Sequence, residues 1–438
     1  PLNFTTAGDI FIIQAGHTAI DATADWTLAG NLVINGTWTT MTKKLSCRTL
    51  TINSGGTFTT VNDATVTSNL TINGTATFGH KMTITGPTTV NGSLILSNNN
   101  IKNVITFIGN VIINSTGVLN ETGVTKYFFR NGITNNGTFT ASTGVHEFNT
   151  NPQTIEGTLS IPNVKVNGIN LTNNGTFTIS AALTEGGTST ITQGVDADLY
   201  FGNTLAIDNL IATATGNTVY FYRAGNQTCK PTSYYNLTLS GSGTKTNTGV
   251  TVNNILSMEG TAALSANMSY GTNATLQYSN TTSRTVNSRE WPATFTPTGG
   301  IIITNSSSVT VNNENKTLSC GVPLTIHSGS SLTLGSNTLS VGGNFTNNGS
   351  FNSNNRALTF GGNFTNTGTL SLGSSNIAIG AGCGGNQSIS GFSTTGTITM
   401  AKTSGTATLT GNVGTGALVL NGTGGTLNLG SGLTHTFS

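Results

Sequence analysis

The sequence predicts an all-β protein built as a parallel β-solenoid (β-helix), in which successive turns of the chain stack on one another. Three observations lead to this fold class: a short internal repeat, strand-type alternation within each repeat, and the near absence of helical periodicity. Antiparallel hairpins in small β-sandwiches are the alternative, but near-identical units of one length favour parallel stacking.

The repeat can be followed at both ends of the chain. NLVINGTWTT at 31–40 returns as NLTINGTATF at 69–78, and GGNFTNNGSF at 342–351 returns as GGNFTNTGTL at 361–370. The shifts are 38 and 19 residues, so the unit is one turn of about 19 residues and the longer shift spans two turns. At a strand spacing of about 4.8 Å, we expect about 23 turns and a rod roughly 110 Å long.

Each unit has the pattern of strands separated by short turns. Apolar residues such as Leu70 and Ile72 alternate with Thr or Asn, the period of a strand with one buried face. Asn-Gly and Gly-Gly pairs lie between these strands, and we expect them to supply the positive φ of tight turns. No apolar stripe of helical spacing occurs, so we expect no helix beyond a turn or two.

Changes in this pattern suggest the domain organisation. Residues 1–30 form a leading segment, and 31–287 form a solenoid with an irregular, tyrosine-rich insertion near 194–235. Residues 288–300 hold two prolines, which cannot lie in a central strand, so this segment is predicted to be a junction. A C-terminal solenoid then covers 301–438.

Composition excludes several classes of function. Only 7% of residues are charged and the net charge is +2, so binding of nucleic acid through a basic surface is not expected. No apolar run reaches the roughly eighteen residues that span a bilayer, so membrane insertion is not expected either. No targeting segment is recognisable, which favours a mature product or an excised part.

Two sets of residues resemble a known family. The opening GDIFIIQAGHTAIDATADWTLAGNLVINGTWTT is one, and a pattern with Gln153, Gln227 or Gln387 before Thr or Ser and a strand about ten residues later is the other. Both resemble the β-strand-repeat surface proteins of the Bacteroidota, exported by the type IX system. The resemblance implies secretion, an extracellular or cell-surface location, and a structural or adhesive role. Filamentous haemagglutinin-like β-helix adhesins are the rival family.

Candidate sites for chemistry are few. Asp196 and Asp198 are two residues apart, hence on one face of a strand, and form a candidate cation or sugar patch. Asp9, Asp21 and Asp25 form the other acidic group. The five histidines are dispersed and the glycine-rich strings match no phosphate loop, so we expect no catalytic residues, no metal and no cofactor.

The four cysteines are far apart in the sequence. Separations of 91 residues from Cys229 to Cys320 and 63 from Cys320 to Cys383 correspond to about five and three turns. That distance is too large for a bond within one stack, so we expect mostly free, buried thiols at Cys47, Cys229, Cys320 and Cys383. An intermolecular disulfide is the alternative.

The leading functional hypothesis is an extracellular structural protein, either a surface fibre or the subunit of a filament. No capping helix is recognisable, so another copy of the chain could stack head to tail on an open end turn. The alternative is an adhesin that binds polysaccharide or a host or biofilm surface through exposed aromatic rings. The candidates for that role are Trp26, Trp38, Tyr234, Tyr235 and Trp291. Repeated Thr-x-Thr pairs raise ice binding as a further alternative, and a polysaccharide-degrading β-helix enzyme is another.

Overall fold

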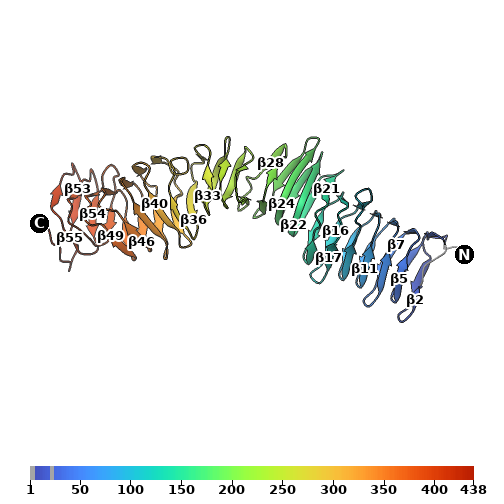
Figure 1. The fold of residues 1–438 in the computed structure, drawn as a ribbon. Coiled ribbons are helices and arrows are strands. Elements are labelled where there is room, and N and C mark those ends of the chain that lie inside the picture. Colours follow the sequence, from blue (N-terminus) through green and yellow to red (C-terminus); the bar gives the residue numbers. More distant parts are fainter. Residues whose placement is uncertain (1–4, 20–23) are drawn as a thin grey trace. The chain divides into compact units, whose positions relative to one another are not determined.

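The computed structural model describes residues 5–19 and 24–438, and every regular element in them is a β-strand. The strands pair in parallel and form a β-solenoid of about 21 turns, with successive turns about 20 residues apart, which confirms the predicted fold class. The turns are fewer than expected because several corners are longer than the repeat suggests. Contacts divide the chain into a first unit, residues 1–219, and a second unit, residues 220–438. Figure 1 shows the strands of each unit lying side by side.

Each early turn of the first unit contributes one strand to each of three sheets. Sheet I contains β1 (Ile10–Ile13), β4 (Asn31–Ile34), β7 (Thr49–Ile52), β10 (Leu70–Ile72), β13 (Thr88–Val90), β16 (Val111–Ile113), β19 (Ile133–Asn135), β23 (Asn170–Asn173), β25 (Thr190–Gln193) and β28 (Asn209–Ile211). Sheet II contains β2 (Thr18–Ala19), β5 (Thr37–Met41), β8 (Thr57–Thr60), β11 (Thr75–Phe78), β14 (Ser93–Leu96), β17 (Val118–Glu121) and β20 (Thr138–Thr140). Sheet III contains β3 (Trp26–Thr27), β6 (Leu45–Cys47), β9 (Ala64–Val66), β12 (Met82–Ile84), β15 (Val104–Phe107), β18 (Lys126–Phe129), β21 (Val145–Asn149), β26 (Asp198–Phe201) and β27 (Thr204–Leu205).

Two long strands later in this unit run past a corner without a break. β22 (Gln153–Asn167) pairs with β23 of sheet I and with β21 of sheet III. β24 (Thr176–Gly186) pairs with β22 over most of its length, with one irregularity between Ile161 and Asn163. Faces that are separate in the early turns therefore merge here.

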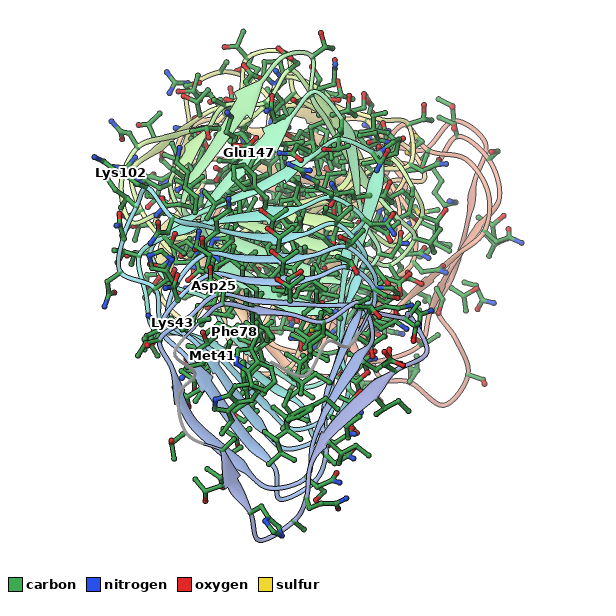
Figure 2. All side chains as sticks on the ribbon, turned by 90° about the vertical axis from the view of Figure 1, so that its right-hand side faces the viewer. Asp25, Met41, Lys43, Phe78, Lys102 and Glu147 are labelled. Atoms are coloured by element: carbon green, nitrogen blue, oxygen red, sulfur yellow. A yellow bond between two sulfur atoms is a disulfide. The ribbon has the colours of Figure 1, made fainter. Side chains whose placement is uncertain are left out.

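Inward-facing side chains form columns along the first unit. Leu32, Leu50 and Leu70 lie in register on three successive turns, and all three are fully buried. Residues 32 and 70 are thus two turns apart, as the repeat predicts. Burial of one such side chain contributes about 1.5–3 kcal/mol. In Figure 2, Phe78 lies within the coil while Lys102 projects from its surface.

The Asn-Gly corners match the sequence-based expectation only in part, since Gly132 and Gly168 have positive φ and other corner glycines do not. Gly74 does not have a positive φ; its role is to allow close approach between turns. A Cβ there would lie 2.3 Å from the backbone oxygen of Gly56 and 2.4 Å from that of Asn53. Because no side chain fits into that gap, glycine sets the tightness of the corner. Gly-Gly pairs also supply positive φ as expected, for example Gly55 at 79°.

The asparagines of these corners hydrogen-bond from turn to turn. The Asn53 Nδ2 donates to Asn35 Oδ1 at 2.7 Å, and the Asn91 Nδ2 donates to Asn73 Oδ1, also at 2.7 Å. Such ladders of identical amides stabilise stacked parallel strands.

The second unit has a different set of sheets. Sheet IV contains β31 (Ser233–Leu239), β33 (Thr251–Met258), β35 (Ser269–Tyr270), β36 (Thr275–Ser279), β39 (Gly300–Thr304), β42 (Leu324–Ile326), β45 (Phe345–Asn347), β48 (Phe364–Asn366), β51 (Gln387–Ile389), β54 (Thr406–Leu409) and β57 (Thr426–Asn428). Sheet V contains β30 (Gln227–Thr228), β32 (Thr244–Thr246) and β34 (Ala263–Leu264). Sheet VI contains β37 (Ser283–Thr285), β40 (Ser308–Val311), β43 (Ser331–Leu334), β46 (Ser350–Asn352) and β49 (Thr369–Ser371). Sheet VII contains β38 (Thr294–Phe295), β41 (Lys316–Leu318), β44 (Leu339–Val341), β47 (Leu358–Phe360), β50 (Ile377–Ile379), β53 (Ile398–Met400) and β56 (Leu418–Leu420), and sheet VIII contains β52 (Phe392–Thr394) and β55 (Val413–Thr415).

The unit boundary lies elsewhere than the junction expected from the sequence. It falls between Val219 and Tyr220, in strand β29 (Thr218–Phe221) and inside the segment 194–235. Residues 288–300 instead contain β38, where sheet VII begins, just after the start of sheet VI. Within the leading segment, β1 already takes part in the coil, since it pairs in parallel with β4.

Candidate functional site

Three of the five aromatic residues suggested for glycan binding lie in the core. Trp38, Tyr234 and Trp291 are fully buried, and the Trp38 ring packs edge-on against Trp26 with 4.8 Å between centroids. A sugar cannot stack on a ring that has no exposed face, so these three residues are corrected to core residues. Trp26 and Tyr235 are half-buried, and a glycan-binding role for them stays a prediction.

Asp196 and Asp198 lie at the start of β26, with Asp196 in the preceding turn rather than in the strand. Asp196 is an exposed turn residue with a φ of 55°, Asp198 begins β26, and the intervening Ala197 is buried. Among the described residues no group of three or more His, Cys, Asp or Glu side chains could hold a metal ion. The cation or sugar patch therefore rests on two carboxylates alone and stays a prediction.

Of the other acidic group, Asp9 and Asp25 lie among the described residues. Asp21 lies outside the described residues. Asp9 accepts a hydrogen bond from the Thr6 hydroxyl at 2.5 Å, and this bond lowers the pKa of the Asp9 carboxyl. Asp25 accepts one from the Lys44 backbone N–H at 3.0 Å. Both carboxylates thus support local backbone structure.

The three glutamines of the repeated Gln-Thr/Ser pattern have a shared structural role. Gln153, Gln227 and Gln387 are all buried. The Gln153 Nε2 donates to the Phe129 carbonyl at 2.8 Å, and its Oε1 accepts from the Gly132 N–H at 3.0 Å. The side chain thereby satisfies backbone groups at a corner of the preceding turn, which would otherwise be buried without partners.

In two of the three cases a buried lysine joins the glutamine. The Lys402 Nζ donates to Gln387 Oε1 at 3.0 Å, and the Lys245 Nζ donates to Gln227 Oε1 at 3.3 Å and to the Arg223 carbonyl at 2.7 Å. Burial lowers the pKa of both lysines because it disfavours the charged ammonium. The Gln-Thr/Ser pattern, one of the two that suggest the family resemblance, therefore has a structural role in stabilising the corners of the coil.

The first unit also encloses a histidine–glutamate pair. The His146 Nε2 lies 2.6 Å from Glu121 Oε2, and its Nδ1 lies 3.0 Å from the Gly144 carbonyl. Both side chains are fully buried, and the Tyr127 ring stacks on the imidazole with 4.7 Å between centroids. Burial, and then the Glu121 charge, raise the pKa of Tyr127. Because the pair is enclosed by the coil, it can support packing but cannot meet a substrate from solution.

An enclosed arginine–glutamate ion pair lies where sheets VI and VII begin. The Arg284 Nη2 and Nε donate to the two carboxylate oxygens of Glu290 at 2.7 and 3.1 Å. The Tyr278 hydroxyl donates to Glu290 Oε1 at 3.3 Å, and the Tyr270 hydroxyl donates to the Glu290 carbonyl at 2.6 Å. Burial raises the pKa of both tyrosines. Residues 288–300 are thus held in place by an internal polar network.

The prediction of free, buried thiols is correct for two of the four cysteines and wrong for the other two. Cys47 and Cys229 are free and buried, as predicted. Cys320 and Cys383, however, form a disulfide with 5.7 Å between their Cα atoms. They lie three turns apart, but the bond forms across corners that project from the stack.

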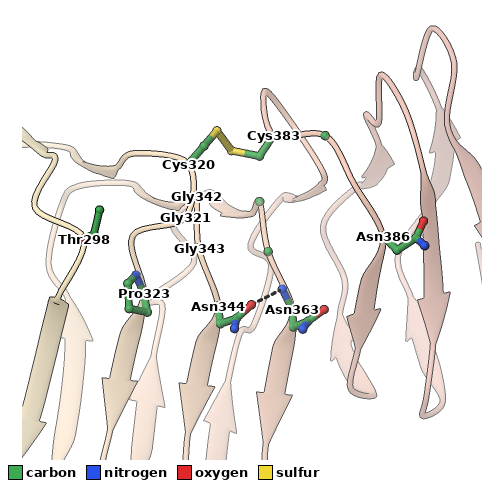
Figure 3. A pocket seen from close by; sticks show the side chains of 13 residues that line it. Thr298, Cys320, Gly321, Pro323, Gly342, Gly343, Asn344, Asn363, Cys383 and Asn386 are labelled. Atoms are coloured by element: carbon green, nitrogen blue, oxygen red, sulfur yellow. Dashed lines mark hydrogen bonds between the residues drawn. A yellow bond between two sulfur atoms is a disulfide. The ribbon is translucent and has the colours of Figure 1, made fainter. Parts of the chain in front are cut away.

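Corner length explains how the bond spans three turns. Cys320 lies in the corner 319–323 and Cys383 in the corner 380–386, whereas the corners of the two intervening turns contain only 342–344 and 361–363. Figure 3 shows the disulfide crossing above these short glycine corners. A Cβ on Gly361 would lie 3.1 Å from the Cys383 Sγ, so glycine leaves room for the bond. Corner length varies from turn to turn, and sequence separation alone does not show it.

A hollow of about 400 Å³ lies beside this disulfide. Its walls include the two cysteines, several glycines and the side chains of Thr298, Pro323, Asn344, Asn363 and Asn386. The Asn344 Oδ1 accepts from the Asn363 N–H at 3.1 Å, and the other two asparagine oxygens accept from the backbone in the same way. Each asparagine can therefore offer a ligand its amide nitrogen and the second lone pair of its oxygen. The lining side chains are neutral, so the hollow could bind a neutral ligand.

The fold defines this chain as a repeat protein of the parallel β-solenoid class. No family model matches the sequence, and no curated protein is similar enough to give a match. In the described part of the chain there is no helix of the length and apolarity needed to cross a bilayer.

Proposed function

We propose that this chain is an extracellular structural protein, a β-solenoid that stacks end to end into a fibre or filament. Parallel pairing throughout each unit supports a structural role, since it satisfies the backbone of each turn by the next. The disulfide supports an oxidising, extracellular location, because such bonds are rare in reducing compartments. The resemblance to surface proteins points in the same direction.

One observation carries the proposal of end-to-end stacking. Leu418 and Leu420 stand in register with Ile398 and Met400 of the preceding turn. Ile398 and Met400 are buried, whereas Leu418 is half-buried and Leu420 is 70% exposed. One further turn of the same kind would cover both leucines and pair with their strand.

The first unit offers a second candidate surface for stacking at β1. Phe11 in β1 is half-buried, while its partner Leu32 in the next turn is fully buried. A turn from a second copy could therefore extend sheet I with the same parallel register and apolar contact. Such a contact joins two different surfaces and propagates as a filament.

Electron microscopy of the native material, with mass determination in solution, tests this proposal. We expect the unmodified chain to form filaments. A Leu418→Glu/Leu420→Glu variant should give single particles instead, because both substitutions place charge in the stacking surface. Val419→Glu is the matched control, since Val419 faces outward on the same strand and should leave filaments intact. Monodisperse particles of the unmodified chain would refute the stacking proposal.

An adhesin is the second candidate, and sheet VI favours it. Its outward face has two columns of small polar residues that run through five turns in register. The columns are Ser283, Ser308, Ser331, Ser350 and Thr369, and Thr285, Thr310, Thr333, Asn352 and Ser371. A regular, uncharged array of hydroxyl groups, with one amide at Asn352, suits the surface of an ordered polysaccharide, and ice binding would also require a regular hydroxyl array.

Sedimentation with crystalline cellulose and chitin particles tests the adhesin candidate. Thr310→Glu/Thr333→Glu should abolish binding if sheet VI is the contact surface. Thr325→Glu, on the outward face of sheet IV, is the control. Absence of binding by the unmodified chain to either polymer counts against this candidate.

A further inference from the structure

The stacking of the second unit is interrupted after residue 371. Sheet VI ends with β49, and the later strand β52 belongs to the separate two-stranded sheet VIII. The backbone ladder on that side of the coil is therefore not continuous through this turn.

Sheet IV is also weakened at the same turn. β45 and β48 pair through three residues, at a spacing of 19 residues along the chain, as in Phe345 and Phe364. β48 and β51 are joined by the single register pair Phe364 and Ile389, 25 residues apart. Only sheet VII runs through with full three-residue pairing, from β47 to β50 and β53. Two of the three faces thus lose pairing at one level of the stack.

The disulfide spans this level. Cys320 follows β41, two turns before the interruption, and Cys383 follows β50, in the first turn after it. Its two ends are thus fixed to turns on opposite sides of the weak level. The bond therefore links the turns before and after the level at which the fewest strand pairs form.

We propose that the Cys320–Cys383 disulfide is a clamp that holds the turns from β51 onward on the stack, and that its reduction releases those turns while β39 to β48 stay ordered. Reduction by a dithiol proceeds by attack of a thiolate on one sulfur, giving a mixed disulfide. The second thiol of the reagent then displaces the protein sulfur, so the protein gains two thiols and the reagent becomes a cyclic disulfide. The inference holds whether or not the chain forms filaments.

Hydrogen exchange of the full chain, read by mass spectrometry, tests the clamp. After treatment with dithiothreitol, we expect amides of β51 and β54 to exchange at least about tenfold faster, and those of β42 and β45 to change by less than about twofold. Free Cys47 and Cys229 do not change with the reagent, and a Cys229→Ala variant should respond as the unmodified chain does.

A Cys320→Ser/Cys383→Ser variant should show the fast exchange without reductant and no further response to it. Equal exchange before and after reduction would overturn the proposal. So would an acceleration that is uniform across the second unit, because the bond would then act as a general stabiliser. Four alkylatable thiols in the denatured, unreduced chain would overturn it as well.

Mechanical unfolding gives an independent reading. While the bond is intact, force cannot extend the chain segment between the two cysteines, which are 63 residues apart in the sequence. Reduction should therefore add roughly 220 Å to the extended length of each molecule. Equal extended lengths in both states would contradict the presence of the clamp.

Discussion

Replacing Glu290 by glutamine should destabilise the second unit severely. The Glu290 side chain has no solvent exposure and that of Arg284 only 8%, and the carboxylate receives two hydrogen bonds from the guanidinium. Glutamine keeps the shape but removes the negative charge. The Arg284 charge would then be buried without a counter-ion.

The magnitude follows from the cost of an uncompensated buried charge. Removing one partner of a buried pair costs about 3–5 kcal/mol. At about 1.4 kcal/mol per factor of ten, the local unfolding constant should rise by roughly two to three and a half powers of ten. An Arg284→Met/Glu290→Leu variant removes both charges and should lie within about 2 kcal/mol of the unmodified protein.

Urea unfolding followed by fluorescence provides the assay. The chain has three tryptophans, and in a Trp26→Phe/Trp38→Phe background the buried Trp291 reports on this region alone. Midpoints should fall far more for Glu290→Gln than for the double variant at an unchanged slope. If the single variant is as stable as the double one, the buried charge is not what holds this region, and the reasoning is refuted.

Three further outcomes are expected. Gly74→Ala should lower stability by about 1–3 kcal/mol in thermal unfolding, because its Cβ would meet backbone oxygens at 2.3 and 2.4 Å, whereas Gly8→Ala, in open space, should be neutral. Burial raises the pKa of Glu147, but hydrogen bonds from two asparagines and a neighbouring lysine lower it more, so its folded pKa lies below the ordinary 4.5. Its stabilisation is therefore present above that value and lost as the pH falls through the folded pKa, and Glu147→Gln should flatten the acid decline of Tm; an unchanged acid profile would contradict this. Burial raises the pKa of Cys47 and Cys229 to about 12, so iodoacetamide at neutral pH should modify neither thiol until the protein is denatured, and modification of the native protein would show that they are accessible.

The parts of the fold that depend on repetition could be predicted from the sequence. Period and alternation specify parallel turns, and Leu32 and Leu70 stand two turns apart as the 38-residue shift requires. The number of faces could not be predicted, because the period gives the length of a turn and not where it bends. The reason for glycine at Gly74 lies in the neighbouring turn, which local turn chemistry does not include.

The candidate sites were harder to predict because their residues depend on exposure and on distant loops. Trp38 lies between Thr37 and Thr39, so strict alternation places its ring inside, and this signal was present in the sequence. Trp291 lies in an irregular segment where alternation gives no guidance. The Cys320–Cys383 bond depends on the reach of two corners, and reach is a property of the folded loops.

The variation in corner length has a consequence for how such a chain can diversify. Corners of three and of seven residues occur in the second unit, and sheet VII keeps its register across the longer corner 380–386, since Ile379 still aligns with Met400. New sequence can therefore be added at a corner while sheet VII keeps its pairing. Loops could be grafted or exchanged at these positions as independent decorations, each displayed at a height fixed by the turn that bears it.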